Sequence, residues 1–136
     1  MSAHKIPRAN SHNTGIAAEY FILSQLYRQS IEAYISIGNT KTIDIKIIKK
    51  DGFAISLDVK AVRGYSSLIV NNLTYRPDHY VAFVVYNENF EQINCMPEVY
   101  IVPSLIVQEI KRDYNKQLRV MKGDIQGFKD QWELIK

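Results

Sequence analysis

The sequence predicts one domain of the α/β (α+β) class, with a central mixed β-sheet flanked by helices. Three observations support this class. Residues 13–28 have the apolar spacing of a helix. The runs 42–47 and 55–61 alternate strictly between apolar and polar residues, as half-buried strands do. Residues 80–86 form a nearly continuous apolar run, which is typical of a strand buried on both faces.

The first half of the chain is expected to contain one helix followed by three strands. Residues 1–12 are polar and are interpreted as a flexible or loosely docked arm, after which Asn13 or Thr14 caps the helix. The first strand is predicted over 31–37. A turn at 38–39 then leads into the two alternating runs.

The second half is expected to contain an irregular segment, two strands and a helix. The segment 64–78 stays unassigned, because turn residues interrupt its one strand-like stretch. After the apolar run, a further strand is predicted over 98–102. Pro103 suits the start of a helix that continues to about Tyr114. A short helix over 128–135 closes the chain. Its docking residues are Phe128, Trp132 and Ile135.

Composition limits the function classes. The length of 136 residues fits a single domain, 1–136, and the formal charge of +3 permits nucleic-acid binding without demonstrating it. The apolar runs are too short to span a bilayer, and no signal peptide is visible. The single cysteine, Cys95, excludes an intramolecular disulfide. We therefore expect a cytoplasmic protein with no membrane segment.

The two alternating runs predict a β-hairpin with a defined register. A three-residue loop with Gly52 in the left-handed conformation, closing a type I turn and a G1 bulge, pairs residue 49 with residue 53. A two-residue loop would instead place the apolar side chains of one strand beside the polar side chains of the other. The first register sets Asp44 directly opposite Asp58, with Lys60 two residues along the same face.

Two aspartates opposed across strands suggest a bound cation, because like charges in such a pair are destabilising. The alternative is a charged strand face in contact with solvent. Basic residues also crowd this hairpin, where they would attract a polyanion or keep an edge strand soluble. These residues are Lys41, Lys46, Lys49, Lys50, Lys60 and Arg63.

Glu19 is a third unusual acid. At about 100° per residue, it is predicted at the centre of a helical stripe formed by Ile16, Ile22, Leu23 and Leu26. A buried carboxylate must become neutral, pair with a cation or reach a metal or cleft. The alternative is a side chain that extends to the helix edge or pairs with a lysine such as Lys60.

Glu19 on a helix, Asp44 on the second strand and Asp58-x-Lys60 on the third resemble the PD-(D/E)XK nuclease superfamily. The resemblance covers residues 13 to about 110, and Ile43 stands where many members have proline. Archaeal Holliday-junction resolvases have a similar layout, and the 128–135 segment resembles the closing tail of some small uncharacterised members.

The resemblance implies a restriction-endonuclease-like fold and a metal-dependent endonuclease that hydrolyses phosphodiester bonds of DNA. Mg²⁺, with Mn²⁺ as a substitute, would be held by Asp44, Asp58 and the backbone carbonyl of Val59. Glu19 would hold a water molecule or a second ion. Lys60 would orient the attacking water and stabilise negative charge in the transition state.

Other residues have secondary roles in this hypothesis. Ser56 and Lys46 share the face of the two aspartates and could contact the scissile strand. Lys5, Arg8, Arg63 and Arg76 are candidate phosphate contacts. The histidines match no zinc spacing; they are His4, His12 and His79.

Two further function classes stay open. The chain could be a non-catalytic nucleic-acid- or protein-binding module that retains the nuclease fold, or a structural partner subunit. The oligomeric state is also open, with a homodimer as one option.

Overall fold

The computed structural model describes residues 8–36 and 44–136, with the side chains of residues 11–36 and 45–136. It is a mixed α/β structure, as predicted. Its elements are α1 (Arg8–Arg28), β1 (Glu32–Ser36), β2 (Asp44–Ile48), β3 (Ala54–Val62), β4 (Ser67–Ile69), β5 (His79–Val85), β6 (Glu98–Pro103), α2 (Ser104–Ile110), β7 (Arg112–Tyr114), β8 (Gln117–Met121) and the 3₁₀ helices η1 (Lys122–Phe128) and η2 (Trp132–Ile135).

The strands form two sheets. The larger has the order β1-β2-β3-β5-β6, in which β3 and β5 are parallel and every other neighbouring pair is antiparallel. This mixed sheet confirms the predicted architecture. The smaller sheet has the order β4-β8-β7 and is antiparallel. The sequence analysis did not anticipate it, because its strands are short and two of them flank a tight turn.

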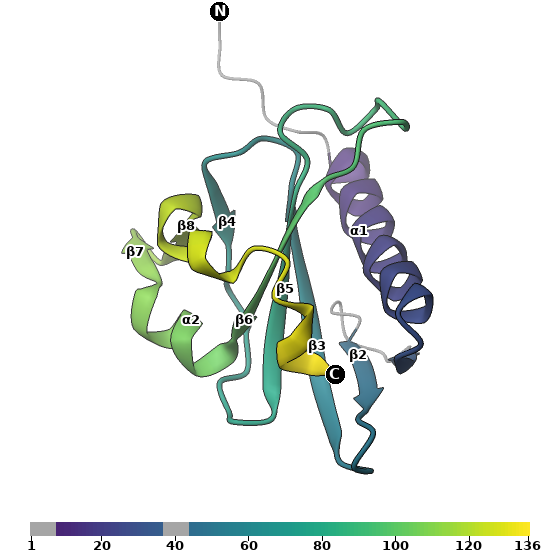
Figure 1. The fold of residues 1–136 in the computed structure, drawn as a ribbon. Helices are drawn as coiled ribbons and strands as arrows, with labels where there is room; N and C mark the ends of the chain where they lie inside the picture. The colour runs from purple at the N-terminus through teal and green to yellow at the C-terminus, as the bar shows by residue number, and fades with distance from the viewer. Residues whose placement is uncertain (1–7, 37–43) are drawn as a thin grey trace, which may run out of the picture.

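The two faces of the large sheet are covered by different elements (Figure 1). Helix α1 lies on one face, where Ala18, Ile22 and Leu26 are fully buried at a spacing of four residues; we call this cluster the first core. The opposite face is covered by α2, β4 and β8, and we call this cluster, which includes Phe83 and Tyr100, the second core. Strand β5 contributes to both cores, which confirms that the apolar run is buried on both faces.

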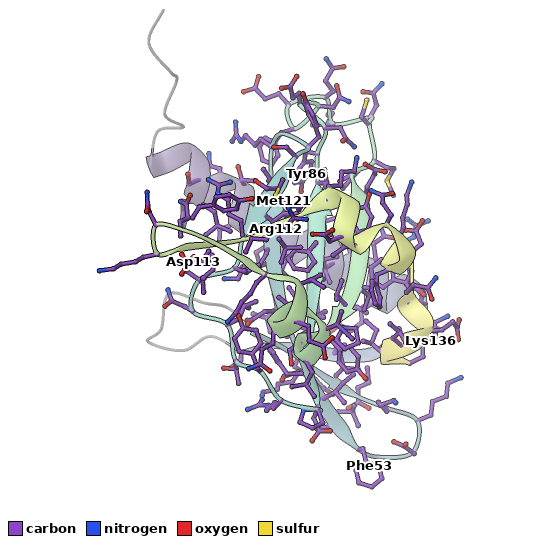
Figure 2. The ribbon with its side chains drawn as sticks, turned by 90° about the vertical axis from the view of Figure 1, so that its left-hand side faces the viewer. Phe53, Tyr86, Arg112, Asp113, Met121 and Lys136 are labelled. Atoms are coloured by element: carbon purple, nitrogen blue, oxygen red, sulfur yellow. The ribbon has the colours of Figure 1, made fainter. Side chains whose placement is uncertain are left out.

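The β2–β3 hairpin has the predicted register. The Gly52 amide donates to the Lys49 carbonyl at 2.9 Å, the Lys49 amide donates to the Phe53 carbonyl at 2.9 Å, and Gly52 has φ +91°. Phe53 marks the hairpin tip, where its ring points away from the molecule (Figure 2). Along the strands the pairs are Ile45 with Leu57, Ile47 with Ile55 and Asp44 with Asp58. The predicted pair of Ile43 with Val59 lies outside the described residues.

Two helix boundaries differ from the prediction. Helix α1 begins at Arg8, so residues 8–12 are helical, whereas the expected arm over 1–7 lies outside the described residues. Helix α2 ends at Ile110 instead of continuing to Tyr114, because Lys111 is extended and residues 112–114 pair with β8. At this point strand pairing overrides the local helical pattern.

The closing segment is two short 3₁₀ helices and not one helix. Between η1 and η2, Asp130 adopts φ +55° and Lys129 forms a bridge with Tyr100 of β6. The break lets the segment reach both faces of the sheet. Phe128 packs against the second core, whereas Trp132 and Ile135 pack in the first core, so the predicted docking residues are confirmed.

Among the described residues, no helix combines the length and apolarity needed to cross a bilayer.

Candidate active site

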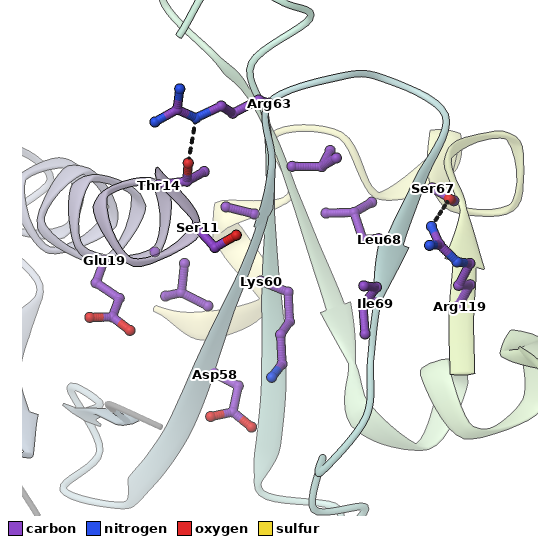
Figure 3. Close-up of a pocket in the computed structure, with 14 residues that line it drawn as sticks. Ser11, Thr14, Glu19, Asp58, Lys60, Arg63, Ser67, Leu68, Ile69 and Arg119 are labelled. Carbon is purple, nitrogen blue, oxygen red and sulfur yellow. Dashed lines mark hydrogen bonds between the residues drawn. The ribbon is translucent and has the colours of Figure 1, made fainter. Parts of the chain in front are cut away.

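A cavity of about 500 Å³ lies where α1, β3 and β4 meet (Figure 3). Its walls include Glu19 from α1, residues 58–63 from β3 and the turn that follows, and Arg119 from β8. The structure thus brings the predicted residues Glu19, Asp58, Val59 and Lys60 to one cavity. Strand β2 ends beside it, with the Asp44 backbone paired to Asp58. The Asp44 side chain lies outside the described residues.

The edge of β3 explains why residues from both faces of the sheet meet here. In the described part of the chain, pairing between β2 and β3 starts at Asp44 and Asp58, and β3 continues to Val62. The alternation of β3 sends Leu57 and Val59 toward the first core, whereas Asp58 and Lys60 take the opposite face. The cavity extends around this strand edge, from α1 on one side to β4 and Arg119 on the other.

The sequence predicted Glu19 at the centre of the buried helix face, and this prediction is wrong. The fully buried row is Ala18, Ile22 and Leu26, whereas Leu23 is only partly buried, and Glu19 lies at the margin of this row. One of its carboxylate oxygens, Oε2, is nevertheless buried. The prediction placed the stripe wrongly because it did not count Ala18, whose small side chain lets the helix approach the sheet. The marginal position directs Glu19 into the cavity (Figure 3).

Asp58 is buried, with 5 % of its surface exposed, and belongs to a chain of polar side chains. Its Oδ2 lies 3.0 Å from His79 Nε2, and His79 Nδ1 lies 2.6 Å from Ser56 Oγ. Arg76 Nη2 donates to the same hydroxyl at 3.0 Å. Ser56 is buried, which corrects its expected contact with the scissile strand. Arg76 is exposed, and its role as a phosphate contact stays a prediction.

The sequence analysis missed the role of His79. It tested histidines only against zinc spacings, and His79 matches none. A usable signal was its position directly before the apolar run 80–86, where a polar residue begins a strand that is otherwise buried. The parallel pairing of β3 with β5 sets His79 beside Ser56, and no local pattern predicts that pairing.

Three cations also line the cavity. Arg63 is braced, because its Nε donates to Thr14 Oγ1 at 2.6 Å and its guanidinium lies 4.0 Å from the centroid of the Phe90 ring. Arg119 donates to Ser67 Oγ at 2.7 Å and to Gln117 Oε1 at 2.8 Å, both neutral acceptors. Within the described residues neither Lys60 nor Arg119 forms an ion pair with a carboxylate. Both side chains line the cavity.

Arg119 was missed because β8 was not predicted. Of the other expected contacts, the described side chain of Lys46 is not part of the cavity. Lys46 is exposed on β2 opposite Ser56, and the side chains of Lys5 and Arg8 lie outside the described residues.

The donor set fits a hard divalent cation. Glu19 and Asp58 supply carboxylate oxygens to one cavity, and Asp44 is directly opposite Asp58 in the hairpin. Among the side chains that the structure describes, which exclude that of Asp44, no three histidines, cysteines or acids converge as a metal-binding group.

Comparison of the chain with protein-family models, with curated proteins and with solved structures gives no match. The argument for function therefore rests on the residues and geometry of the cavity.

Proposed function

We propose that this chain is a divalent-metal-dependent endonuclease of the PD-(D/E)XK superfamily, with a restriction-endonuclease-like fold, that hydrolyses phosphodiester bonds in DNA. The observation that supports this most directly is the pairing of Asp44 with Asp58 across the β2–β3 hairpin. Lys60 lies two residues along the same face, and Glu19 reaches the same cavity from α1. The four residues of the proposed motif thus come from three elements.

The burial of Asp58 argues against a solvent-exposed charged strand face. A buried carboxylate costs several kcal/mol unless it is hydrogen-bonded or paired, and His79 supplies one such partner to Asp58 through Oδ2. Its backbone neighbour across the hairpin is a second aspartate, and opposed like charges are unfavourable. A cation between the two acids removes that penalty.

Two kinds of groups lie at the cavity: those that would bind the metal and those that would bind phosphate. Asp44, Asp58, Glu19 and the Val59 carbonyl would hold Mg²⁺, with Mn²⁺ as a substitute. When bound, the ion polarises the phosphodiester and lowers the pKa of a coordinated water.

The residues of the chain would perform the remaining tasks. The Lys60 ammonium donates hydrogen bonds to the attacking water and to the non-bridging phosphate oxygens, where negative charge develops. Arg119, fixed by two neutral acceptors, binds a neighbouring phosphate of the strand.

The first experiment measures cleavage of plasmid DNA and of labelled DNA and RNA oligonucleotides in Mg²⁺ and Mn²⁺. We expect Asp58→Asn and Lys60→Met to lower the rate about 10²–10³-fold, because each removes charge stabilisation from the transition state. Asp113→Asn and Lys50→Met are matched controls, since both residues are exposed and lie outside the cavity. The controls should cleave like the unmodified protein.

Metal-dependent cleavage that survives both site substitutions would sink the proposal. Salt-sensitive DNA binding without turnover in either metal would instead identify a binding module that retains the fold. Cleavage of RNA alone would keep the chemistry and correct the substrate.

A further inference from the structure

His79 is the one buried histidine among the described residues, with 2 % of its surface exposed, and both of its ring nitrogens have partners. The sheet explains this placement. Parallel pairing sets His79 of β5 beside Ser56 of β3, and Asp58 lies two residues further along β3 on the same face. The imidazole can therefore contact Ser56 with one nitrogen and Asp58 with the other.

The direction of these hydrogen bonds depends on the two outer members of the hydrogen-bonded row, Arg76 and Asp58. Arginine has only donors, so Ser56 Oγ accepts from Arg76 and keeps a hydrogen and a second lone pair, either of which can face His79 Nδ1. At the other end an ionised carboxylate only accepts, so His79 Nε2 carries the hydrogen that Asp58 Oδ2 receives. The Asp58 end thus assigns a hydrogen to Nε2, and the Ser56 hydroxyl, which can donate or accept, is compatible with that assignment.

This arrangement constrains the rotation of the Asp58 carboxylate. Because the hydrogen bond through Oδ2 already restricts the rotation of the carboxylate, less conformational entropy is lost when an ion binds. Hydrogen bonds from a histidine or another polar group to a ligating residue commonly contribute to metal affinity in this way. Packing alone does not require a polar ring here, since the neighbouring residues of β5 are apolar.

We propose that His79 is a positioning residue of the nuclease site, which holds Asp58 through Oδ2 so that Asp58 binds the divalent cation through Oδ1. Ser56, which accepts from Arg76, contacts the other ring nitrogen and helps to hold the orientation of the imidazole. This inference rests on the proposed function, because it assigns His79 a role in the metal site of that nuclease.

The test compares His79→Leu with His79→Gln in the full chain. Leucine removes the donor, whereas the glutamine amide can place an N–H close to the position of Nε2. Isothermal titration with Mn²⁺ should give about 10–100-fold weaker binding for His79→Leu and a recovery of most of that loss for His79→Gln. Circular dichroism checks that both variants are folded.

Cleavage at increasing Mn²⁺ separates positioning from a structural role. A defect in metal affinity is overcome by more metal, so the rate of His79→Leu should approach that of the unmodified protein at saturating Mn²⁺. A rate that stays low at saturation, or Mn²⁺ affinity equal to that of the unmodified protein, would overturn the inference.

If His79→Leu does not fold, Ser56→Ala decides the question. This small change removes the partner of Nδ1 that helps to hold the ring in place, so a weaker loss of Mn²⁺ affinity, of several-fold, is expected. An unchanged Mn²⁺ affinity of Ser56→Ala would contradict the positioning role of His79. If the unmodified protein neither binds Mn²⁺ nor cleaves DNA, the proposed function fails and this inference fails with it. If the unmodified protein does both and the variants bind Mn²⁺ as tightly as it does, only the inference fails.

Discussion

At the scale of one residue, Arg119 shows how neutral partners hold an arginine at the wall of a cavity. Its guanidinium is held between Ser67 and Gln117, two neutral acceptors that fix its position without neutralising it. Arg112, by contrast, pairs with Asp124 at 2.8 Å and lies outside the cavity. Two arginines from neighbouring strands therefore differ in whether their charge is available to a phosphate.

We expect Arg119→Gln to weaken DNA binding to a similar degree on all sequences, because phosphate contacts do not read bases. It should also reduce the slope of log affinity against log salt by about one, which corresponds to one lost phosphate contact. Fluorescence anisotropy at several salt concentrations in Ca²⁺ measures both quantities. Arg112→Gln is the control and should keep the original slope. An unchanged slope for Arg119→Gln would remove Arg119 from the binding surface.

At the scale of elements, Glu98 joins β6 to η1 and to the segment after it. Its carboxylate is 2.8 Å from Lys122 Nζ and 3.0 Å from Lys129 Nζ, and Asn87 Nδ2 donates to it at 2.8 Å. The hydrogen bonds from Lys122, Asn87 and Lys129 outweigh the effect of burial and lower the pKa of Glu98 from 4.5 to about 2. The closing segment is thus attached to the sheet by charge as well as by apolar packing.

This depressed pKa predicts a pH-dependent contribution to stability. The unfolded chain protonates Glu98 near its ordinary pKa of 4.5, before the folded protein does, so the stabilisation is complete above that pH. It is lost as the pH falls toward 2. The partner lysines have raised pKa values, so their own contribution is lost only at strongly alkaline pH.

We therefore expect Glu98→Gln to reduce the free energy of unfolding by a nearly constant amount between pH 5 and 8. The difference from the unmodified protein should shrink between pH about 4.5 and 2, as measured by urea unfolding at each pH. Glu133→Gln is the control, because Glu133 pairs with Lys136 at an exposed site where solvent screens the charge. A difference for Glu98→Gln that does not change with pH would contradict the assignment.

At the scale of the whole molecule, the large sheet separates two apolar cores. The chain end returns across the sheet to contribute to both, with Phe128 against the second core and Ile135 fully buried in the first. The closing residues are thus part of the packing that supports α1 and, through it, the position of Glu19.

Ile135→Ala should lower the free energy of unfolding by about 2–5 kcal/mol, because it removes buried methylenes and leaves a cavity. Ile93→Ala is the matched control. Ile93 is 99 % exposed, so the same chemical change should stay within about 0.5 kcal/mol. Urea unfolding followed by circular dichroism measures both. Equal effects for the two variants would show that the chain end does not support the first core.

The sequence predicted the hairpin register correctly because two local properties agreed. The alternation of Ile45, Ile47, Ile55 and Leu57 defined one apolar face, and Gly52 permits the three-residue turn that keeps this face together. The opposition of Asp44 and Asp58 is a consequence of these local constraints. The end of α2 and the centre of the α1 stripe were predicted wrongly, since strand pairing by residues 112–114 and close packing of Ala18 decide them.

By itself the sequence determined the composition of the candidate site: two acids on paired strands, a lysine on the same face and a glutamate on the first helix. Only the tertiary structure decided what surrounds it. The parallel pairing of β3 with β5 brings His79 to Asp58, and the smaller sheet brings Arg119 to the cavity. The physical reason is that alternation and turns are properties of neighbouring residues. Contacts across a crossover depend instead on how distant segments bury their apolar faces together.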